Sequence, residues 1–262
     1  MKPLLRLGLD ILVVAAFTAV WALSAGMAKS SRNSRTCQGK GSLEVIVSDS
    51  LERRFVAKAD VQQWLQAEYG AYAGQRLDSV DLARVERIVS GHSAVRACEA
   101  WLTDDGILHV QLSQRQPVLR LDDGSNACYS DETGYLFPLQ RGGSAEVPVV
   151  GGKIPFKLER GYKGYPQKAE DMLWLQRVIG VTNYMKGTIW EKNIAKMDVD
   201  ADGDLVLYPA QGKEKFIFGA PVKIEDKFRL VTAYYRSVVP SLPEGKTYTR
   251  VDVRHRSQIV CK

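Results

Sequence analysis

An uncharged run near the N-terminus constrains this chain more than any other feature. It extends from Ile11 to Ala28 and contains no Asp, Glu, Lys or Arg. As an α-helix it would be about 27 Å long, close to the thickness of the hydrocarbon core of a bilayer. A helix satisfies its backbone hydrogen bonds internally, as lipid requires. The run therefore predicts a single transmembrane helix that contacts membrane lipid through residues 11–28.

The side chains expected to anchor this helix are all apolar. They are Ile11, Leu12, Val13, Val14, Phe17, Val20, Trp21 and Leu23. A cleaved signal peptide is a second interpretation, because Gly26-Met27-Ala28 resembles a small-x-small cleavage site. A buried helix of the globular fold is disfavoured, since the run is terminal and apolar on every face.

The basic residues around the run do not settle its orientation. Lys2 and Arg6 favour an N-terminus inside the cell, whereas three basic residues just after the run favour the opposite. The distribution of mass favours export, because most of the chain follows the run. We therefore expect a short cytoplasmic head at residues 1–10 and a large region outside the membrane.

Composition places the remaining chain among ordinary globular proteins. About 230 residues follow the run, enough for one large domain or two modest ones. The hydrophobic fraction of 45% and the charged fraction of 25% do not indicate disorder. The net charge of +6 is spread along the chain. Clustered basic residues with interleaved aromatics are missing, so we do not expect nucleic-acid binding.

The four cysteines are at positions 37, 98, 128 and 261. No two of them have a CxxC spacing, and the three histidines are scattered, so a zinc site is not expected. In an exported domain disulfides can form. Cys37 and Cys261 lie near the two ends of the exported region, and a bridge between them would staple those ends. Cys98 and Cys128 are interpreted as small buried residues.

The order of predicted elements divides the exported region. Residues 29–42 are polar and rich in Gly and Ser, which predicts a flexible stalk. Residues 43–116 then predict a strand, two helices and two strands: Leu43–Val47, a helix capped by Asp60 and closed by Gly70, a helix near Asp78–Val89, Val95–Leu102 and Ile107–Gln114. Asp104-Asp105-Gly106 between the last two strands is a strong hairpin signal.

Residues 117–262 predict a second domain with an α+β fold, in which antiparallel strands are flanked by helices. Hairpins are expected over Cys128–Pro138 and over Ile194–Val199 with Asp204–Tyr208. Helices are expected from Pro166 to about Val181 and over Ile224–Val239. The remaining strands are expected at Val147–Gly151, Lys215–Phe218, Tyr248–Arg254 and Ser257–Cys261. The apolar spacing within each helix favours one buried face.

Motifs for metal or catalytic chemistry fail on inspection. Asp198-x-Asp200-x-Asp202-Gly203 begins like a calcium loop, but Pro209 stands where the loop needs a glutamate. A hairpin turn at Asp202-Gly203 explains the glycine better. A phosphate-binding loop and a nucleophile elbow each lack a required glycine. We therefore expect no catalytic residues, no metal and no cofactor.

The last strand is the best candidate for a functional site. A terminal strand with nothing to cover it leaves the edge of a sheet unpaired, and a partner strand can add there. The candidate partner-binding residues are Val251, Val253, Arg254, His255, Arg256, Ser257, Gln258, Ile259 and Val260. The alternative is that this strand lies inside the sheet and completes the fold.

Four features in order resemble the FtsQ/DivIB division proteins across essentially the whole chain. A strand-helix-helix-strand-strand unit outside a membrane anchor looks like a POTRA domain. The segment Gln114-Arg115-Gln116-Pro117-Val118-Leu119-Arg120 resembles the exit of that domain in the family. Tyr129-x-Asp131-x-x-Gly134-x-x-Phe137-Pro138 resembles the start of its β domain, and Phe218-Gly219, a helix and Val251-Asp252-Val253-Arg254 follow its closing order.

The resemblance implies partners for the last strand. In FtsQ-like proteins this region receives FtsB, a small single-pass coiled-coil protein that comes with FtsL. His255 stands where the family has tyrosine, which removes an aromatic anchor of a kind often important at interfaces. Binding through the same mode is expected, with an altered strength.

The resemblance also implies a non-enzymatic adaptor of cell division in the inner membrane. It would cross the membrane once, with its N-terminus in the cytoplasm and its two domains in the periplasm at the septum. Two alternatives stay open. One is a POTRA-bearing envelope assembly factor that binds extended chains, and the other is a secreted cell-wall hydrolase.

Overall fold

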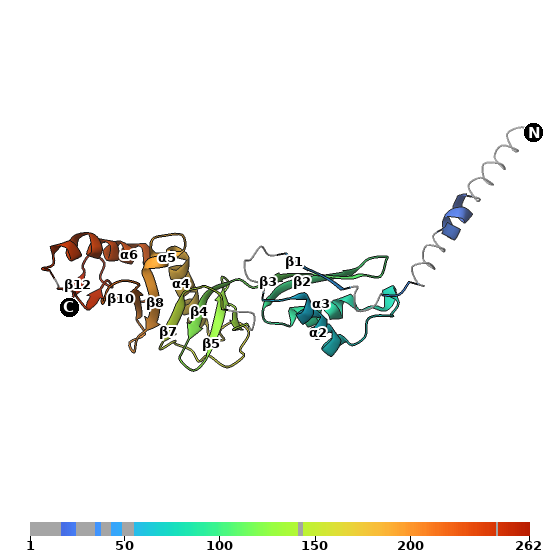
Figure 1. The fold of residues 1–262 in the computed structure, drawn as a ribbon, viewed down its shortest axis with the longest axis horizontal. Coiled ribbons are helices and arrows are strands. Elements are labelled where there is room, and N and C mark those ends of the chain that lie inside the picture. Colours follow the sequence, from blue (N-terminus) through green and yellow to red (C-terminus); the bar gives the residue numbers. More distant parts are fainter. Residues whose placement is uncertain (1–16, 25–34, 38–42, 49–54, 141–143, 245) are drawn as a thin grey trace, which may run out of the picture. The chain divides into compact units, whose positions relative to one another are not determined.

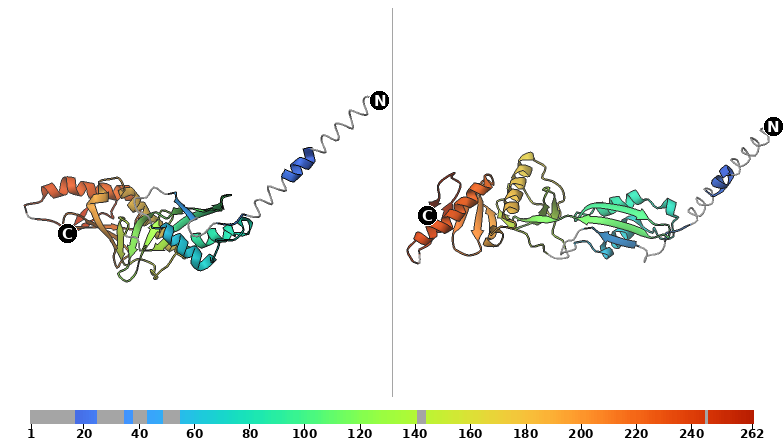
Figure 2. Two further views of the ribbon diagram at one scale, coloured as in Figure 1. Left: turned by 45° about the vertical axis from the view of Figure 1, so that its right-hand side comes forward. Right: turned by 90° about the horizontal axis from the view of Figure 1, so that it is seen from above.

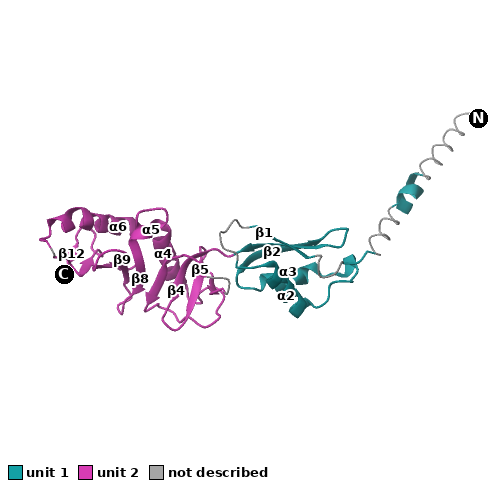
Figure 3. Ribbon diagram, in the orientation of Figure 1, with its two compact units in different colours: residues 1–114 teal, residues 115–262 magenta. Residues whose placement is uncertain are grey.

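The structure is a computed structural model that describes residues 17–24, 35–37, 43–48, 55–140, 144–244 and 246–262 (Figure 1). The chain divides into two compact units, residues 1–114 and residues 115–262 (Figure 3). The sequence-based boundary, between residues 116 and 117, lies two residues from this division.

Only part of the predicted transmembrane segment is described. Residues 17–24 are helical, and the side chains of Phe17 and Trp21 are 74% and 75% exposed. Among the described residues, no helix combines the length and the apolar character that crossing a membrane requires. The rest of the predicted segment, residues 11–16 and 25–28, lies outside the described residues, as does most of the predicted stalk.

The first unit has the predicted order of strand, helix, helix, strand and strand. Its elements are β1 (Leu43–Val47), α2 (Lys58–Trp64), a π-helical turn (Leu65–Tyr69), a 3-10 turn (Leu77–Ser79), α3 (Leu82–Ser90), β2 (Val95–Leu102) and β3 (Leu108–Gln114). The sheet order is β1-β3-β2, with β1 parallel and β2 antiparallel to β3. Helices α2 and α3 lie against one face of this sheet (Figure 2).

Alternating side chains on β3 form the core of this unit. Leu108, Val110 and Leu112 are at most 1% exposed and pack against the buried face of α3. The helix starts differ in detail from the prediction. Asp60 lies within α2 rather than before it, and its carboxylate accepts a hydrogen bond from the backbone N–H of Ala57 at 2.8 Å.

The second unit is built on one nine-stranded sheet. Its strands are β4 (Pro117–Asp122), β5 (Ala127–Asp131), β6 (Leu136–Pro138), β7 (Val149–Gly152), β8 (Ile194–Val199), β9 (Leu205–Pro209), β10 (Lys215–Gly219), β11 (Arg250–Asp252) and β12 (Val260–Cys261). The order across the sheet is β12-β11-β10-β9-β8-β7-β4-β5-β6. Strands β12 and β6 are therefore its two edges.

The sheet is more mixed than the antiparallel arrangement that we expected. Strand pairs β4–β7, β7–β8 and β10–β11 are parallel, and the remaining pairs are antiparallel. Two of the parallel pairs have a helix in their connection: α4 (Ala169–Met185) between β7 and β8, and α6 (Ile224–Ala233) between β10 and β11. Parallel neighbours need such a crossover, which predicted hairpins alone do not supply.

Helices α4 and α6 lie along the same face of this sheet (Figures 1 and 2). Their inner side chains, among them Val178, Phe228 and Val231, are at most 1% exposed and pack on buried residues of the strands. Helix α4 begins at Ala169 rather than at Pro166. The predicted final helix ends at Ala233 and continues as a π-helical turn (Tyr234–Val238) and a 3-10 turn (Val239–Ser241).

Two adjacent side chains mark the division between the units. The side-chain oxygen of Gln114 accepts hydrogen bonds from the N–H groups of Phe55 and Val56 in the first unit, at 2.6 and 2.9 Å. The guanidinium of Arg115 donates to Asp131 in the second unit at 2.8 Å and stacks over the ring of Tyr135 at 3.5 Å. Each of the two neighbours is thus fixed within a different unit.

Candidate partner-binding edge

Strand β12 forms one edge of the nine-stranded sheet. It pairs antiparallel with β11 only, with Val260 opposite Asp252 and Cys261 opposite Val251. Within the described part of the chain, no strand pairs with its outer side. The last strand is therefore an edge strand, as expected, and does not lie inside the sheet.

The hydrogen bonds next to β12 show which of its backbone groups face outward. Lys262 donates to the carbonyl of Arg250 at 2.9 Å and accepts from the N–H of Arg250 at 3.1 Å. In an antiparallel pair, hydrogen-bonded and non-hydrogen-bonded positions alternate. The N–H and C=O of Cys261 therefore point away from β11, and those of Ile259 follow the same alternation. These groups are the ones that an added strand would use.

The predicted partner-binding residues fall into three groups by their exposure. Val251 and Val253 are 0% exposed and pack in the core, so these two residues cannot contact a partner and their assignment was wrong. The exposed residues are Arg254, His255, Arg256, Ser257, Gln258 and Val260. Ile259 is half-buried against the core and holds the segment to the unit.

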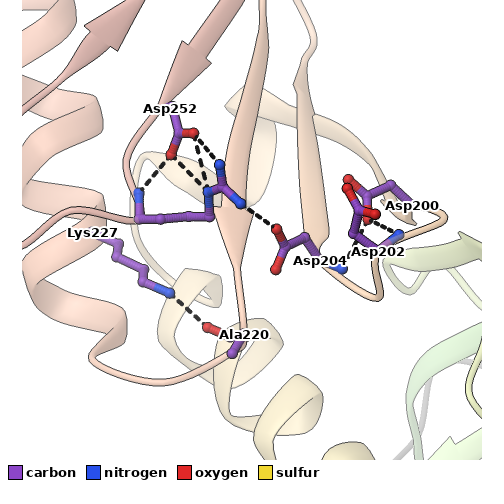
Figure 4. Close-up of polar contacts among 7 residues, drawn as sticks. Asp200, Asp202, Asp204, Ala220, Lys227 and Asp252 are labelled. Atoms are coloured by element: carbon purple, nitrogen blue, oxygen red, sulfur yellow. Dashed lines mark hydrogen bonds and ion pairs between the residues drawn. The ribbon is translucent and has the colours of Figure 1, made fainter.

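Arg254 fixes the approach to β12 through two carboxylates. Its guanidinium donates to Asp252 at 2.6 and 3.0 Å and to Asp204, which follows the β8–β9 turn, at 2.7 Å (Figure 4). Its backbone N–H also donates to Asp252, at 3.1 Å. Paired charge-assisted bonds of this kind are stronger than neutral ones and restrict geometry. Arg254 is thus a positioning residue for the edge as well as part of its surface.

The electrostatics of this cluster follow from its contacts. Burial alone would raise the pKa of Asp252, but the hydrogen bonds from the guanidinium and backbone of Arg254 outweigh burial and hold that pKa below its usual value. The same contacts raise the pKa of Arg254, chiefly through the hydrogen bond to Asp252. Both groups are therefore charged at neutral pH, as the ion pair requires.

Gly219 and Lys227 pack beneath this cluster. Gly219 has a φ of +73°, and a side-chain Cβ there would lie 2.7 Å from Cγ of Arg254. Lys227, on α6 and 7% exposed, donates to the carbonyl of Ala220 at 2.6 Å (Figure 4). Burial lowers the pKa of Lys227. Glycine at this position leaves room for the arginine stem, and the lysine fixes the turn that follows β10.

A basic hollow lies beside the open edge. Its volume is about 230 Å³, and Arg250, Asp252, Arg254, His255, Val260 and Lys262 line it. Three of these residues are permanent cations and one is a carboxylate already engaged by Arg254. The surface around β12 is therefore polar and positively charged.

The opposite edge of the sheet is closed. The N–H of Leu136 on β6 donates to the carbonyl of Gly164 at 2.8 Å, and the N–H of Gly164 donates back at 3.0 Å. By alternation, the next outward position on β6 is Pro138, which has no N–H to offer. Strand β6 thus has no free donor at its outward positions.

The acidic loop between β8 and β9 forms the hairpin that the sequence predicts. Strands β8 and β9 are antiparallel, and the carboxylate of Asp200 accepts from the N–H groups of Asp202 and Asp204 at 3.0 and 2.9 Å (Figure 4). These bonds give the carboxylate of Asp200 a structural role in the turn. Among the described residues, no group of three His, Cys, Asp or Glu side chains could hold a metal ion.

The cysteines are all free thiols. Cys37 is buried in the first unit, where its thiol contacts the carbonyl of Gly106 at 3.4 Å, and Cys261 lies on β12 of the second unit. The bridge expected between these two residues is not formed. Burial raises the pKa of Cys128 to about 12, so this thiol stays neutral.

Sequence reasoning did not assign three residues of the arginine cluster to the site: Asp204, Lys227 and Asp252. Asp252 and Arg254 are two residues apart, a spacing that places both on the same side of an extended chain and was a usable signal. Asp204 joins them from the residue just before β9, a strand that lies two places from β11 in the sheet, and nothing local in the sequence marks that register.

Comparison with known proteins completes the description of this edge. The family model described as FtsQ/DivIB, C-terminal related, matches residues 116–262, more than half of the chain. A model of the POTRA-like domain matches residues 36–113. A search of curated proteins finds no match to the chain.

Proposed function

This chain belongs to the FtsQ/DivIB family, whose domains indicate a cell division protein, and we propose that it works as a non-enzymatic membrane adaptor. In this proposal residues 11–28 cross the inner membrane, the N-terminus is cytoplasmic and both units lie in the periplasm at the septum. The adaptor links division proteins by binding them through its exposed surfaces.

One observation supports the binding site more than any other: no strand of the described residues pairs with the outer side of β12. A strand that adds there gains hydrogen bonds to the outward groups of Ile259 and Cys261, while side chains set its specificity. The exposed run from Arg254 to Gln258 lies next to this edge and supplies polar contacts. We propose that the added strand comes from an FtsB-like single-pass protein, which arrives together with an FtsL-like protein.

Confinement to one membrane makes modest contacts sufficient. Two single-pass proteins in the same bilayer meet at a high effective concentration, so a short added strand can recruit a partner without a large interface. The side chain of His255 is exposed, and it stands at the position where the family has tyrosine. We expect it to weaken the interface relative to tyrosine, because aromatic residues contribute strongly to hot spots.

Site-specific photocrosslinking tests this proposal. A photoreactive amino acid at Val260 samples the open edge, and the same amino acid at Leu139, just beyond β6, is the control. The two residues match in exposure, each being 39% exposed. In native membranes that contain the full chain, we expect crosslinks from position 260, and none from position 139, to small single-pass coiled-coil proteins.

The identity of the crosslinked proteins decides between the candidates. Outer-membrane precursors at position 260 would favour the envelope assembly factor instead. Equal capture of the coiled-coil proteins at both positions would contradict the assignment of the site to β12.

A further inference from the structure

A second recess lies in the second unit, at the start of helix α4. Its volume is about 320 Å³, within the range of pockets that hold small ligands. Apolar side chains make up much of its wall, among them Leu136, Phe156, Leu158, Tyr162 and Pro166. None of these residues belongs to the β12 edge. The pocket is therefore a separate feature of the unit.

The wall of the pocket carries two carboxylates, of which Glu159 is exposed and Asp171 is buried without a partner among the described residues. Asp171, in the first turn of α4, is 9% exposed and lines the pocket. It makes no hydrogen bond or ion pair with any residue that the structure describes. Buried charged groups are normally paired, because leaving one unpaired costs several times the free energy of an ordinary hydrogen bond.

The surroundings of Asp171 do not supply the missing partner. The positive end of the helix macrodipole stabilises a carboxylate in the first turn, but it does not replace a hydrogen-bond donor. Lys168 also lines the pocket, and its ammonium pairs instead with Glu170, at 3.8 Å. The other cation of the lining, Lys157, is exposed. The carboxylate is thus available to a group that enters from outside.

We propose that this pocket binds a guanidinium or ammonium group carried on an apolar stem. The cationic head pairs with Asp171, and the stem packs against Leu136 and Leu158. The rings of Phe156 and Tyr162 offer faces on which a cation is attracted. This chemistry is that of an arginine or lysine side chain of a bound protein, and also that of a free polyamine.

A charged probe and a neutral probe with similar apolar stems test the proposal on the full chain. Binding of n-butylguanidinium is compared with that of n-pentanol, a neutral molecule with a similar apolar stem, by saturation-transfer NMR titration. The Asp171→Asn variant keeps the size and removes the charge. We expect it to bind n-butylguanidinium about tenfold more weakly, and n-pentanol with unchanged affinity.

A neighbouring carboxylate provides the matched control. Glu170→Gln removes a charge from the same turn of α4, but Glu170 is exposed and does not line the pocket. We expect this variant to bind n-butylguanidinium as the unmodified chain does. Chemical denaturation checks that both variants are folded. No binding of n-butylguanidinium to the unmodified chain, or equal binding to the Asp171→Asn variant, would overturn the proposal.

The same titration separates the two sources of the cation. A blocked Gly-Arg-Gly peptide represents a protein side chain, and spermidine represents a free polyamine. Tighter binding of the peptide assigns the pocket to a protein partner, and tighter binding of spermidine assigns it to a small molecule. In both cases the preference must disappear in the Asp171→Asn variant, and its persistence there would count against the pocket.

Discussion

The two edges of the nine-stranded sheet differ in how their outward backbone groups are used. At β6, the outward groups of Leu136 pair with Gly164, and the next outward position is Pro138, which has no donor. At β12, the outward groups of Cys261 meet no strand within the described residues. Natural sheets close their edges to prevent unwanted pairing. When one edge of a sheet is closed and the opposite edge is open, the open edge is therefore a candidate for binding another strand.

The largest expected effect comes from closing the open edge in the way that β6 is closed. Cys261→Pro removes the outward N–H, while the inward groups of Val260 and Lys262 still pair with β11. We expect the affinity for the protein captured at β12 to fall about 100-fold, because a proline blocks strand addition. Affinity is measured with full-length proteins in bilayer discs.

The control for this change is Cys261→Ala, which removes the thiol and keeps the donor. It should bind the partner as the unmodified chain does. Partner binding that survives in a folded Cys261→Pro protein would show that the edge groups are not used, and the contrast between the two edges would lose its functional meaning.

The next effect concerns what holds the open edge in place. Arg254→Met keeps the stem over Gly219 but removes the donors to Asp252 and Asp204. We expect the second unit to lose about 2 kcal/mol of unfolding free energy, because Asp252, 7% exposed, loses its ion pair and keeps only the hydrogen bond from the backbone N–H of residue 254. Urea denaturation measures the loss. Arg256→Met, at an exposed neighbour, is the control, and an equal loss there would argue against the ion-pair explanation.

Acid should weaken the same ion pair. The pKa of Asp252 is lowered in the folded protein, so its stabilising contribution is complete above the unfolded value near pH 4 and disappears as the pH falls through the folded value. The unfolding free energy of the unmodified chain should therefore fall more steeply below about pH 4 than that of Asp252→Asn. Parallel slopes would mean that Asp252 does not carry this acid sensitivity.

The smallest effect comes from opening the closed edge. Pro138→Val restores an outward donor on β6 without disturbing the pairing of Leu136 with Gly164. A single added hydrogen bond is worth about 1 kcal/mol, so we expect self-association to strengthen by less than tenfold. Sedimentation measures this change. A strong dimer would show that Pro138 alone, rather than the proline and the Gly164 bridge together, keeps this edge closed.

The sequence predicted best those elements whose structure is determined by neighbouring residues. The hairpin turn at Asp202-Gly203 depends on neighbouring residues, and the predicted domain boundary, after residue 116, lies two residues from the division of the structure. Strand positions along the second unit were also mostly correct, because apolar runs between turn residues mark them. The order of these elements along the sequence is what resembled the FtsQ/DivIB family, and the family models match it.

The features that the sequence could not supply depend on which strands become neighbours. Strand β11 pairs in parallel with β10 across the whole of α6, and this pairing decides that Val251 and Val253 face the core. The sequence shows two valines near an exposed segment and does not show which side of the sheet they take. Likewise, Asp171 has an ordinary place in a first helical turn, and only the fold buries it.

The pairing of Gly164 with β6 has a consequence for stoichiometry. A sheet with two open edges is divalent, and copies of it can join head to tail into an open filament. Closing β6 leaves this sheet monovalent, so one added strand saturates it and the assembly ends there. Each copy of the chain would then recruit a single partner strand, and the number of partners at a site would follow the number of copies in the membrane.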